Sequence, residues 1–330
     1  MKNFVLLIIL FCITQFGLVA QSSYWGKEIP QDTTYTVYQT YTKIRKNFPD
    51  ARPALAILPK GILAERDLIY AVITDSLNKK RNLHLDVFHP SKPGKYPVLI
   101  MIHGGGWRSG NKLMQVPMAM QIAANGYVTV AVEYELSLEA PYPNAVHNIK
   151  SAIRWMRINA SKYGIDTAHI AISGCSSGGH LAVLTGMTNS VPRFEGNMGN
   201  SGSSSSIQAV IDIDGVVDFM APASLRIERT SKSPDAAWLG GTFYDKPGIW
   251  KEASPIFWVN KNSPPVMFLN SGFSKYHAGQ DEMIGIMNEY GVYNEVHKFD
   301  VKMHPFWLFH PWFDPTVGYM INFLNKEFKR

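Results

Sequence analysis

Cysteine is nearly absent from the 330-residue sequence, which contains only Cys12 and Cys175. Cys12 falls in the opening stretch MKNFVLLIILFCITQFGLVA, where one lysine precedes a dense apolar run and Ala20 ends it. That pattern predicts a secretory signal peptide over residues 1–20, and therefore export to the periplasm or the exterior. Once this segment is removed, Cys175 has no partner with which to form an internal disulfide.

Other features are missing as well. The apolar run Phe4–Phe11 is too short to span a bilayer, which takes ~20 residues. A lipoprotein anchor on Cys12 is the alternative, but Phe11 precedes it where such a site needs a small residue. Lys and Arg are scattered, so the formal charge of +6 predicts no nucleic-acid partner. Because no HExxH motif or metal-ligand spacing of histidines occurs, we expect no metal or organic cofactor.

The composition favours a large folded core, with 46% hydrophobic and 18% charged residues. From about Glu65 onward, β-type runs alternate with helical patterns, which predicts an α/β fold with a mostly parallel central sheet and helices on both faces. The clearest predicted strands are 97–104, 127–134, 169–174, 207–215, 264–272 and 293–300. Apolar residues at three- and four-residue spacing predict an amphipathic helix within 143–164. Further helices are expected to begin near 178 and 281, and the last covers about 316–328.

Three stretches stand apart from this alternation. The polar, Tyr-rich residues 21–64 are predicted to pack as an N-terminal extension on one domain over 65–330. The Gly/Ser/Asn-rich segment 192–208 is typical of a surface loop. The Trp-, Pro- and Lys-rich residues 219–263 separate two predicted strands and are expected to form a small lid over the strand ends. No stretch has the composition of a linker between independent domains.

Ser176 stands at the centre of a G-x-S-x-G pattern, between the predicted strand 169–174 and a helix that begins near 178. In a strand–turn–helix elbow of this kind the turn is tight, so side chains at the two glycine positions would collide with the strand or the helix. The central hydroxyl then projects at the start of a helix, whose dipole favours developing negative charge. Ser176 is therefore the candidate nucleophile, with Cys175 and Ser177 pointing to either side.

A second glycine motif, HGGGW at residues 103–107, follows the predicted strand 97–104. A Gly-rich turn at that place leaves backbone N–H groups free to face a ligand. No GK[ST] follows it, which argues against a phosphate loop. We assign the oxyanion-hole donors to the amides of Gly105, Gly106 or Trp107 together with that of Ser177, each typically worth ~3 kcal/mol in the transition state.

With both motifs in this order, residues 133–182 (EYELSLEAPYPNAVHNIKSAIRWMRINASKYGIDTAHIAISGCSSGGHLA) resemble α/β-hydrolase esterases related to hormone-sensitive lipase. They are most similar to the branch of secreted acetyl-xylan, feruloyl and pectin-type carbohydrate esterases, which carries HGGGW, Tyr-x-Leu-Ser and G-x-S-[AS]-G-G-H-L-A. The resemblance covers about residues 80–328 and implies an α/β-hydrolase fold with a small lid. Glu135 stands where that family often has Arg, and Asn148 where it often has Asp.

In this fold the nucleophile is followed along the chain first by an acid and then by a histidine. His304 begins the loop after the last predicted strand, where the family places its base, whereas His297 lies within the strand and His310 in an aromatic segment. The family's usual acid position falls in residues 270–275, NSGFSK, which hold no carboxylate. Asp281 is our first choice for the acid and Asp218 the second; the other possibilities are Asp214, Glu282 or no acid at all.

These features predict an exported serine esterase that hydrolyses O-esters on a polysaccharide or oligosaccharide, with acetyl as the expected group. The alternatives are a pectin methyl esterase, a general carboxylesterase or lipase-like hydrolase, and a non-catalytic carbohydrate-binding pseudo-esterase that has lost its acid. His103, Arg108 and Trp307 are candidate substrate contacts. The sequence indicates an esterified carbohydrate as partner and does not predict the oligomeric state.

Overall fold

The computed structural model describes residues 35–74 and 80–329. The predicted signal peptide at residues 1–20 lies outside these ranges, as do residues 21–34 of the predicted extension. Among the described residues, no helix combines the length and the hydropathy needed to cross a membrane.

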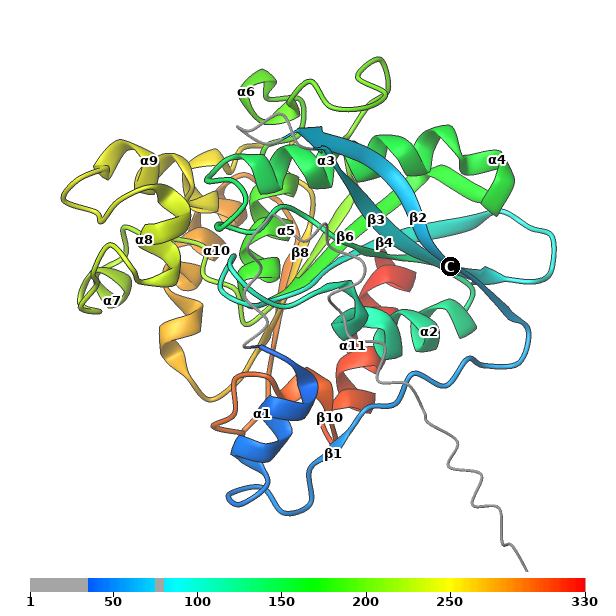
Figure 1. The fold of residues 1–330 in the computed structure, drawn as a ribbon, viewed down its shortest axis with the longest axis horizontal. Helices are drawn as coiled ribbons and strands as arrows, with labels where there is room; N and C mark the ends of the chain where they lie inside the picture. The colour runs from blue at the N-terminus through cyan, green and yellow to red at the C-terminus, as the bar shows by residue number, and fades with distance from the viewer. Residues whose placement is uncertain (1–34, 75–79, 330) are drawn as a thin grey trace, which may run out of the picture.

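An eight-stranded sheet forms the centre of the molecule (Figure 1), with strand order β2-β3-β5-β4-β6-β7-β8-β9. Its strands are β2 Ile62–Thr74, β3 Lys80–Pro90, β4 Tyr96–Ile102, β5 Val128–Val132, β6 Ile165–Cys175, β7 Ala209–Ile213, β8 Val266–Asn270 and β9 Asn294–Lys298. From β5 to β9 all neighbours are parallel, and only β2 with β3 and β3 with β5 are antiparallel. All six predicted strands are present, and the predicted mostly parallel sheet is confirmed.

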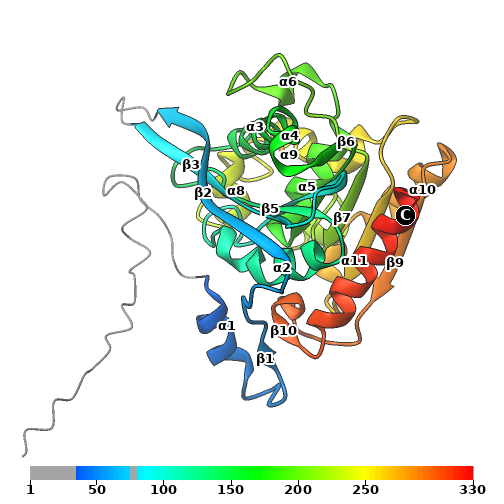
Figure 2. The ribbon, with the colours of Figure 1, turned by 90° about the vertical axis from the view of Figure 1, so that its right-hand side faces the viewer.

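Helices cover both faces of this sheet. The longer ones are α2 Val116–Ala124, α3 Asn144–Ile158, α5 Ser177–Met187, α10 Gln280–Glu289 and α11 Phe313–Glu327. Figures 1 and 2 show α3 on one face of the sheet, with α2 and α11 together on the other. Two separate clusters of buried apolar side chains match this division, one including α3, α5 and α10 and the other α2 and α11. The sheet therefore has an apolar core on each face, as expected for parallel strands that are buried on both faces.

Strand β2 carries the main departure from the expected pattern. It contains the charged run Glu65–Asp67, its register shifts between Glu65 and Leu68, and Asp67 has a positive φ of 55°. A charged bulge interrupts the alternation of apolar and polar residues that identifies a half-buried strand. For this reason the sequence does not indicate a strand beginning at Ile62.

The described part of the N-terminal extension packs against the C-terminal part of the chain. Helix α1 (Val37–Ile44) is followed by β1 (Arg52–Pro53), which pairs antiparallel with β10 (Phe309–His310). The Tyr41 ring stacks on that of Phe309 with centroids 6.3 Å apart. These contacts join residues 35–53 to the segment that follows His304.

The insertion at residues 219–263 contains three short α-helices, α7 Pro222–Leu225, α8 Pro234–Leu239 and α9 Pro247–Glu252. They gather beside α10 at one end of the molecule (Figure 1). The Trp238 ring of α8 stacks on that of Trp107, with centroids 5.2 Å apart. The insertion therefore packs directly on the HGGGW turn that follows β4.

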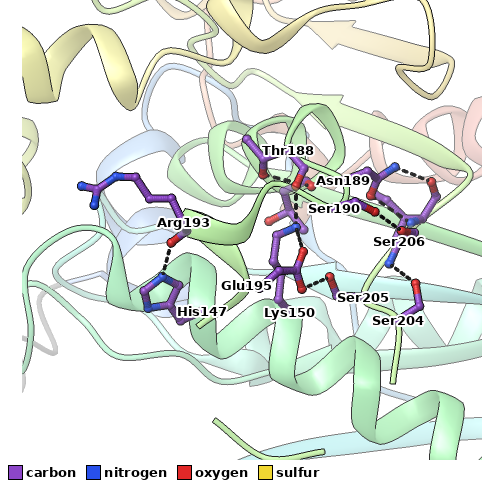
Figure 3. Close-up of polar contacts among 12 residues, drawn as sticks. His147, Lys150, Thr188, Asn189, Ser190, Arg193, Glu195, Ser204, Ser205 and Ser206 are labelled. Carbon is purple, nitrogen blue, oxygen red and sulfur yellow. Dashed lines mark hydrogen bonds and ion pairs between the residues drawn. The ribbon is translucent and has the colours of Figure 1, made fainter. Parts of the chain in front are cut away.

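The loop at 192–208 is held by buried charges. It begins with the short helix α6 (Pro192–Glu195). Figure 3 shows the Lys150 ammonium of α3 between the Glu195 carboxylate, at 2.9 Å, and the Thr188 carbonyl, at 2.7 Å. Arg154 also pairs with Glu195, and Ser205 donates to the same carboxylate at 2.6 Å. Burial lowers the pKa of Lys150, and Glu195 partly offsets it. A buried ammonium is tolerated only when it is paired in this way, so Glu195 fixes the loop to α3.

Candidate active site

Ser176 occupies the tight turn between β6 and α5, with φ 56° and ψ −124°. Such a conformation is strained for a residue with a Cβ. The flanking glycines leave room for the turn. A Cβ on Gly174 would lie 1.9 Å from the Gly178 carbonyl oxygen, and one on Gly178 would lie 2.3 Å from the carbonyl oxygen of Ile102. The G-x-S-x-G spacing is therefore a steric requirement, and it presents the Ser176 hydroxyl at the beginning of α5.

The structure brings Ser176 and His304 together. The Ser176 Oγ lies 2.7 Å from His304 Nε2, and His304 Nδ1 lies 2.8 Å from the Asp214 Oδ2. His304 comes from the loop after β9, and Asp214 directly follows β7, which is hydrogen-bonded to the strand that leads to Ser176. The Ser176 amide donates to the Ile213 carbonyl at 2.7 Å, which fixes this juxtaposition.

The predicted acids Asp281 and Asp218 are wrong, because the structure places neither against His304. Asp281 is exposed in the first turn of α10. The Asp218 carboxylate instead accepts the Met220 amide at 2.7 Å, in a local turn. Asp214 takes the position because its φ of 54° turns the chain at the carboxyl end of β7. The signal in the sequence was the Asp-Gly pair that ends the run AVIDIDG, a common turn dipeptide.

Asp214 receives donors on both carboxylate oxygens. Oδ2 faces His304, while Oδ1 accepts the Ser271 amide at 2.7 Å and lies 2.9 Å from His277 Nε2. Burial on its own raises the pKa of Asp214, but the hydrogen bonds from His277, His304 and Ser271 outweigh it and hold the pKa below its usual value. Asp214 is therefore a stable anion beside His304. Ser271 and His277, which donate to Asp214, both come from the segment after β8, where the family resemblance placed the acid.

His304 lies between two aromatic rings. The Tyr276 ring stacks on its imidazole at 3.5 Å between centroids, and the Trp307 ring meets it edge-on at 5.2 Å. Burial lowers the pKa of His304, partly offset by Asp214, and the nearby positive charge of Lys275 lowers it further. A histidine with a lowered pKa is neutral at neutral pH, so Nε2 is free to accept the Ser176 proton.

The predicted oxyanion-hole residues line the same cavity as Ser176. Among the described residues, the backbone amides of Gly105, Gly106, Trp107 and Ser177 have no hydrogen-bond acceptor. Gly105 has φ 131°, and a Cβ there would lie 2.0 Å from the Ser109 carbonyl oxygen, so only glycine fits this turn. Free amides at a Gly-rich turn and at a helix N-terminus are the arrangement that stabilises an oxyanion.

A cavity of about 780 Å³ opens above the Ser176 hydroxyl. Arg108 lines it, as predicted for a substrate contact. His103 and Trp307 do not, which corrects their predicted role. His103 is buried, with its ring stacked on Tyr134 at 4.4 Å, and Trp307 is buried behind His304. Tyr35, which no sequence pattern indicated as a site residue, also lines this cavity from the N-terminal extension.

Cys175 is buried next to the candidate nucleophile and packs in the core shared by α2 and α11. Its Sγ lies 3.5 Å from the Gln115 Nε2, and burial raises the pKa of its thiol. A neutral, buried thiol is a poor nucleophile. Cys175 is therefore a packing residue.

The two departures from the family pattern touch each other. The Asn148 side chain accepts the Glu135 amide at 2.8 Å and donates to the Glu135 Oε2 at 2.9 Å. Burial raises the pKa of Glu135, and Asn148 partly offsets this. These two hydrogen bonds connect the Glu135 segment to α3.

Comparisons with known proteins find esterases among the proteins similar to this chain. The BD-FAE family model matches residues 85–284, more than half of the chain. The esterase LipC of Mycobacterium tuberculosis is 32% identical over 182 residues, which are 55% of this chain and 44% of that protein. The probable carboxylic ester hydrolase LipM of the same organism is 30% identical over 225 residues, 64% of this chain and 48% of that protein. The chain thus spans less than half the length of these curated relatives.

Solved structures with a similar fold are found as well. The bifunctional GH43-CE protein of Bacteroides eggerthii has a TM-score of 0.68 and 26% identity, over 80% of this chain and 38% of that one. A truncated form of a carbohydrate esterase from gut microbiota has a TM-score of 0.66 and 22% identity, over 84% of this chain and 99% of that one.

Proposed function

Because the chain belongs to the BD-FAE family of α/β-hydrolase esterases, we propose that it is a serine esterase acting on O-esters of a polysaccharide or oligosaccharide, with acetyl as the group released. One observation carries the proposal: an unbroken line of hydrogen bonds from Ser176 through His304 to the Asp214 anion, at 2.7 and 2.8 Å. A line of this kind is the arrangement that activates a hydroxyl for acyl transfer.

In the first half of the proposed reaction, Ser176 Oγ attacks the ester carbonyl carbon. Its proton moves to His304 Nε2, and the carbonyl oxygen becomes an oxyanion facing the amides of the Gly105 turn and Ser177. Asp214 stabilises the imidazolium through Nδ1. When the tetrahedral intermediate collapses, the C–O bond to the sugar breaks and His304 returns its proton to the departing sugar hydroxyl.

In the second half, water replaces the sugar. His304 Nε2 takes a proton from the water as its oxygen attacks the acyl-enzyme, and a second oxyanion forms against the same amides. Collapse returns the proton to Ser176 Oγ and releases the acid. The lowered pKa of His304 supports this role, because the same imidazole must be neutral at the start of each half.

The choice of a carbohydrate ester rests on two supports. Solved structures with a similar fold include a carbohydrate esterase and a bifunctional GH43-CE protein. The cavity also carries charged and hydroxyl side chains besides its apolar ones, including Arg108, Glu228 and Ser224. The pseudo-esterase alternative assumed that no carboxylate contacts His304. The contact of Asp214 with His304 Nδ1 therefore argues against it.

A release screen tests the proposal and its nearest rivals together. Acetylated xylan, pectin and p-nitrophenyl acetate are incubated with the wild-type protein and with Ser176→Ala, and free acetate and methanol are measured. We expect acetate from the glycan in the wild type only. Release of methanol alone would favour a pectin methyl esterase. Release of p-nitrophenol without turnover of either glycan would favour a general carboxylesterase. No turnover of any ester by the wild type would contradict the enzyme assignment.

We also propose that the protein is exported, with residues 1–20 as its signal peptide. The support is the pattern of one lysine, a dense apolar run and Ala20 before the start of the mature chain. Mass spectrometry of the N-terminus of protein secreted by a native host tests this. A mature chain that begins near Gln21 is expected, and an intact Met1 in the cytoplasmic fraction would refute it.

A further inference from the structure

A second hollow lies beside the active-site cavity, within the insertion of residues 219–263. Its volume is about 570 Å³, inside the ~300–1,000 Å³ range of small-molecule sites. The segment after α7 lines one side, and the loop that joins α8 to α9 lines the other. Ile227, Glu228, Arg229 and Ser233 line both hollows, so one stretch of chain forms the wall between them.

The wall between the hollows is held in place by Arg229. Its guanidinium pairs with Asp235 and donates to the Ser224 Oγ at 3.1 Å. The same group lies over the ring of Trp250, 5.1 Å from its centroid, and Trp250 is buried. Because the charge of Arg229 is balanced by Asp235 and its donors are engaged, the wall is a built feature of the insertion.

The lining of the second hollow is polar and balanced in charge. Arg226 and Glu228 carry opposite charges, and Thr230, Ser233 and Thr242 contribute hydroxyl groups. With Arg229 already paired, the remaining charges do not favour an anion over a neutral ligand. Hydroxyl groups and side chains of balanced charge suit a ligand rich in hydroxyl groups.

Tyr244 adds a flat aromatic surface at this hollow. Its side chain is 92% exposed, although the residue lines the hollow. Its ring meets Phe243 edge-on at 5.6 Å, and Phe243 in turn lies 6.4 Å from the buried Trp250. The Tyr244 ring therefore meets Phe243 along one edge and is otherwise open to solvent. A pyranose combines an apolar C–H face with hydroxyl edges, which complements an open ring next to hydroxyl side chains.

We propose that this hollow is a distal sugar subsite, which binds a neutral glycosyl residue of the substrate chain while the esterified residue lies over Ser176. The inference rests on the proposed function and extends it from a single ester to an oligosaccharide. Tyr244 provides the stacking face, and the wall formed by Ile227, Glu228 and Arg229 separates the two binding positions. The enzyme therefore prefers esterified chains longer than one residue.

Steady-state kinetics on acetylated xylo-oligosaccharides of one to six residues test this, compared with p-nitrophenyl acetate. In the wild type, KM falls as the chain becomes long enough to reach the second hollow. Tyr244→Ala raises KM for the longest oligosaccharide about five- to tenfold. It leaves KM for the single acetylated sugar and for p-nitrophenyl acetate unchanged, because neither reaches the hollow.

Two further variants serve as controls. Tyr244→Trp retains a stacking face and should keep the wild-type KM. Tyr290→Ala removes a half-exposed tyrosine that lines neither hollow and should have no effect on any substrate. The subsite is contradicted if KM does not depend on chain length, or if Tyr244→Ala does not change KM for the longest oligosaccharide. Turnover of p-nitrophenyl acetate would in that case still support the esterase assignment. If the wild type hydrolyses none of these esters, the proposed function itself is contradicted.

Discussion

Asp214 illustrates how strongly a single residue depends on its surroundings. Alone in the interior, its carboxyl group would hold a proton, because burial disfavours the charge. Hydrogen bonds from two histidines and one backbone amide reverse this and lower its pKa. The same three donors fix the direction of both carboxylate oxygens, so Asp214 holds the tautomer of His304 in which Nε2 accepts the Ser176 proton.

Substitution of Asp214 tests whether it, and not one of the two carboxylates that the sequence favoured, is the acid of the site. Asp214→Asn removes the anion and favours the wrong imidazole tautomer, so we expect kcat on p-nitrophenyl acetate to fall about 10³- to 10⁴-fold. Asp281→Asn and Asp218→Asn are the matched controls and should retain wild-type kcat within a few-fold. A large loss in Asp281→Asn, with Asp214→Asn fully active, would contradict the assignment.

His277 acts on the reaction through Asp214, as a positioning residue. We expect kcat of His277→Ala to fall about 10- to 100-fold, the range for groups that orient a functional residue. His277→Gln keeps a side-chain N–H donor and should recover part of the loss. Circular dichroism should show the same folded content for all three proteins.

The pH profile distinguishes this role from a structural one. His304 must be neutral, so kcat/KM falls as the pH drops through its lowered pKa, and the acidic limb of the wild type lies below 6.5. His277 contributes to lowering the pKa of His304, so His277→Ala should move the limb to higher pH. A lower plateau with an unmoved limb would indicate that His277 matters only for packing.

At the scale of the elements, Ser176 and Asp214 lie in turns at the carboxyl ends of the neighbouring strands β6 and β7. Both residues have positive φ, and both follow strands of the parallel part of the sheet. The carboxyl ends of parallel strands meet at one edge, where ligand sites of α/β folds form. Local sequence patterns identify Ser176 and His304, because a glycine elbow and the loop after a strand are local features.

The sequence ranked Asp214 behind Asp281 and Asp218, because the position of the acid depends on which element supplies it. Residues 270–275 lack a carboxylate, and the chain instead uses Asp214 at the end of β7. Ser271 and His277, from the segment after β8, supply donors to it. Such a relocation becomes visible only when β7 and β8 lie side by side. For the same reason, the sequence did not show that Trp307 and His103 are buried.

The contact of Glu135 with Asn148 is likewise a property of two elements. Asn148→Asp places a second carboxylate against a buried one, so we expect the free energy of unfolding to fall by about 3 kcal/mol at pH 8. Like charges raise the folded-state pKa of both groups, so stability is retained at low pH and lost as the pH rises. Urea unfolding at pH 5 and pH 8 measures the difference.

The double variant Glu135→Arg/Asn148→Asp provides the control. It replaces the two like charges with an opposite-charge pair and should recover most of the lost stability at pH 8. Equal stability of Asn148→Asp and the wild type at both pH values would show that the two side chains are not coupled.

Across the whole molecule, the predicted α/β-hydrolase fold is confirmed, with its mostly parallel sheet and a helical insertion near the nucleophile. The strongly apolar strands made the sheet predictable, because parallel strands buried on both faces form continuous apolar runs. Charged β2 and the contact of residues 35–53 with the C-terminal segment were not, since both depend on distant partners. Tyr35 enters the cavity by this long-range packing alone.

Trapping the acyl-enzyme tests the central claim most directly. The protein is quenched with acid during turnover of p-nitrophenyl acetate, digested, and analysed by mass spectrometry. We predict one acetyl group on the peptide that contains Ser176, which fragmentation of that peptide locates at Ser176, and none on that peptide in Ser176→Ala. An acetyl group on Cys175 or His304 in its place, or undiminished turnover by Ser176→Ala, would contradict the account.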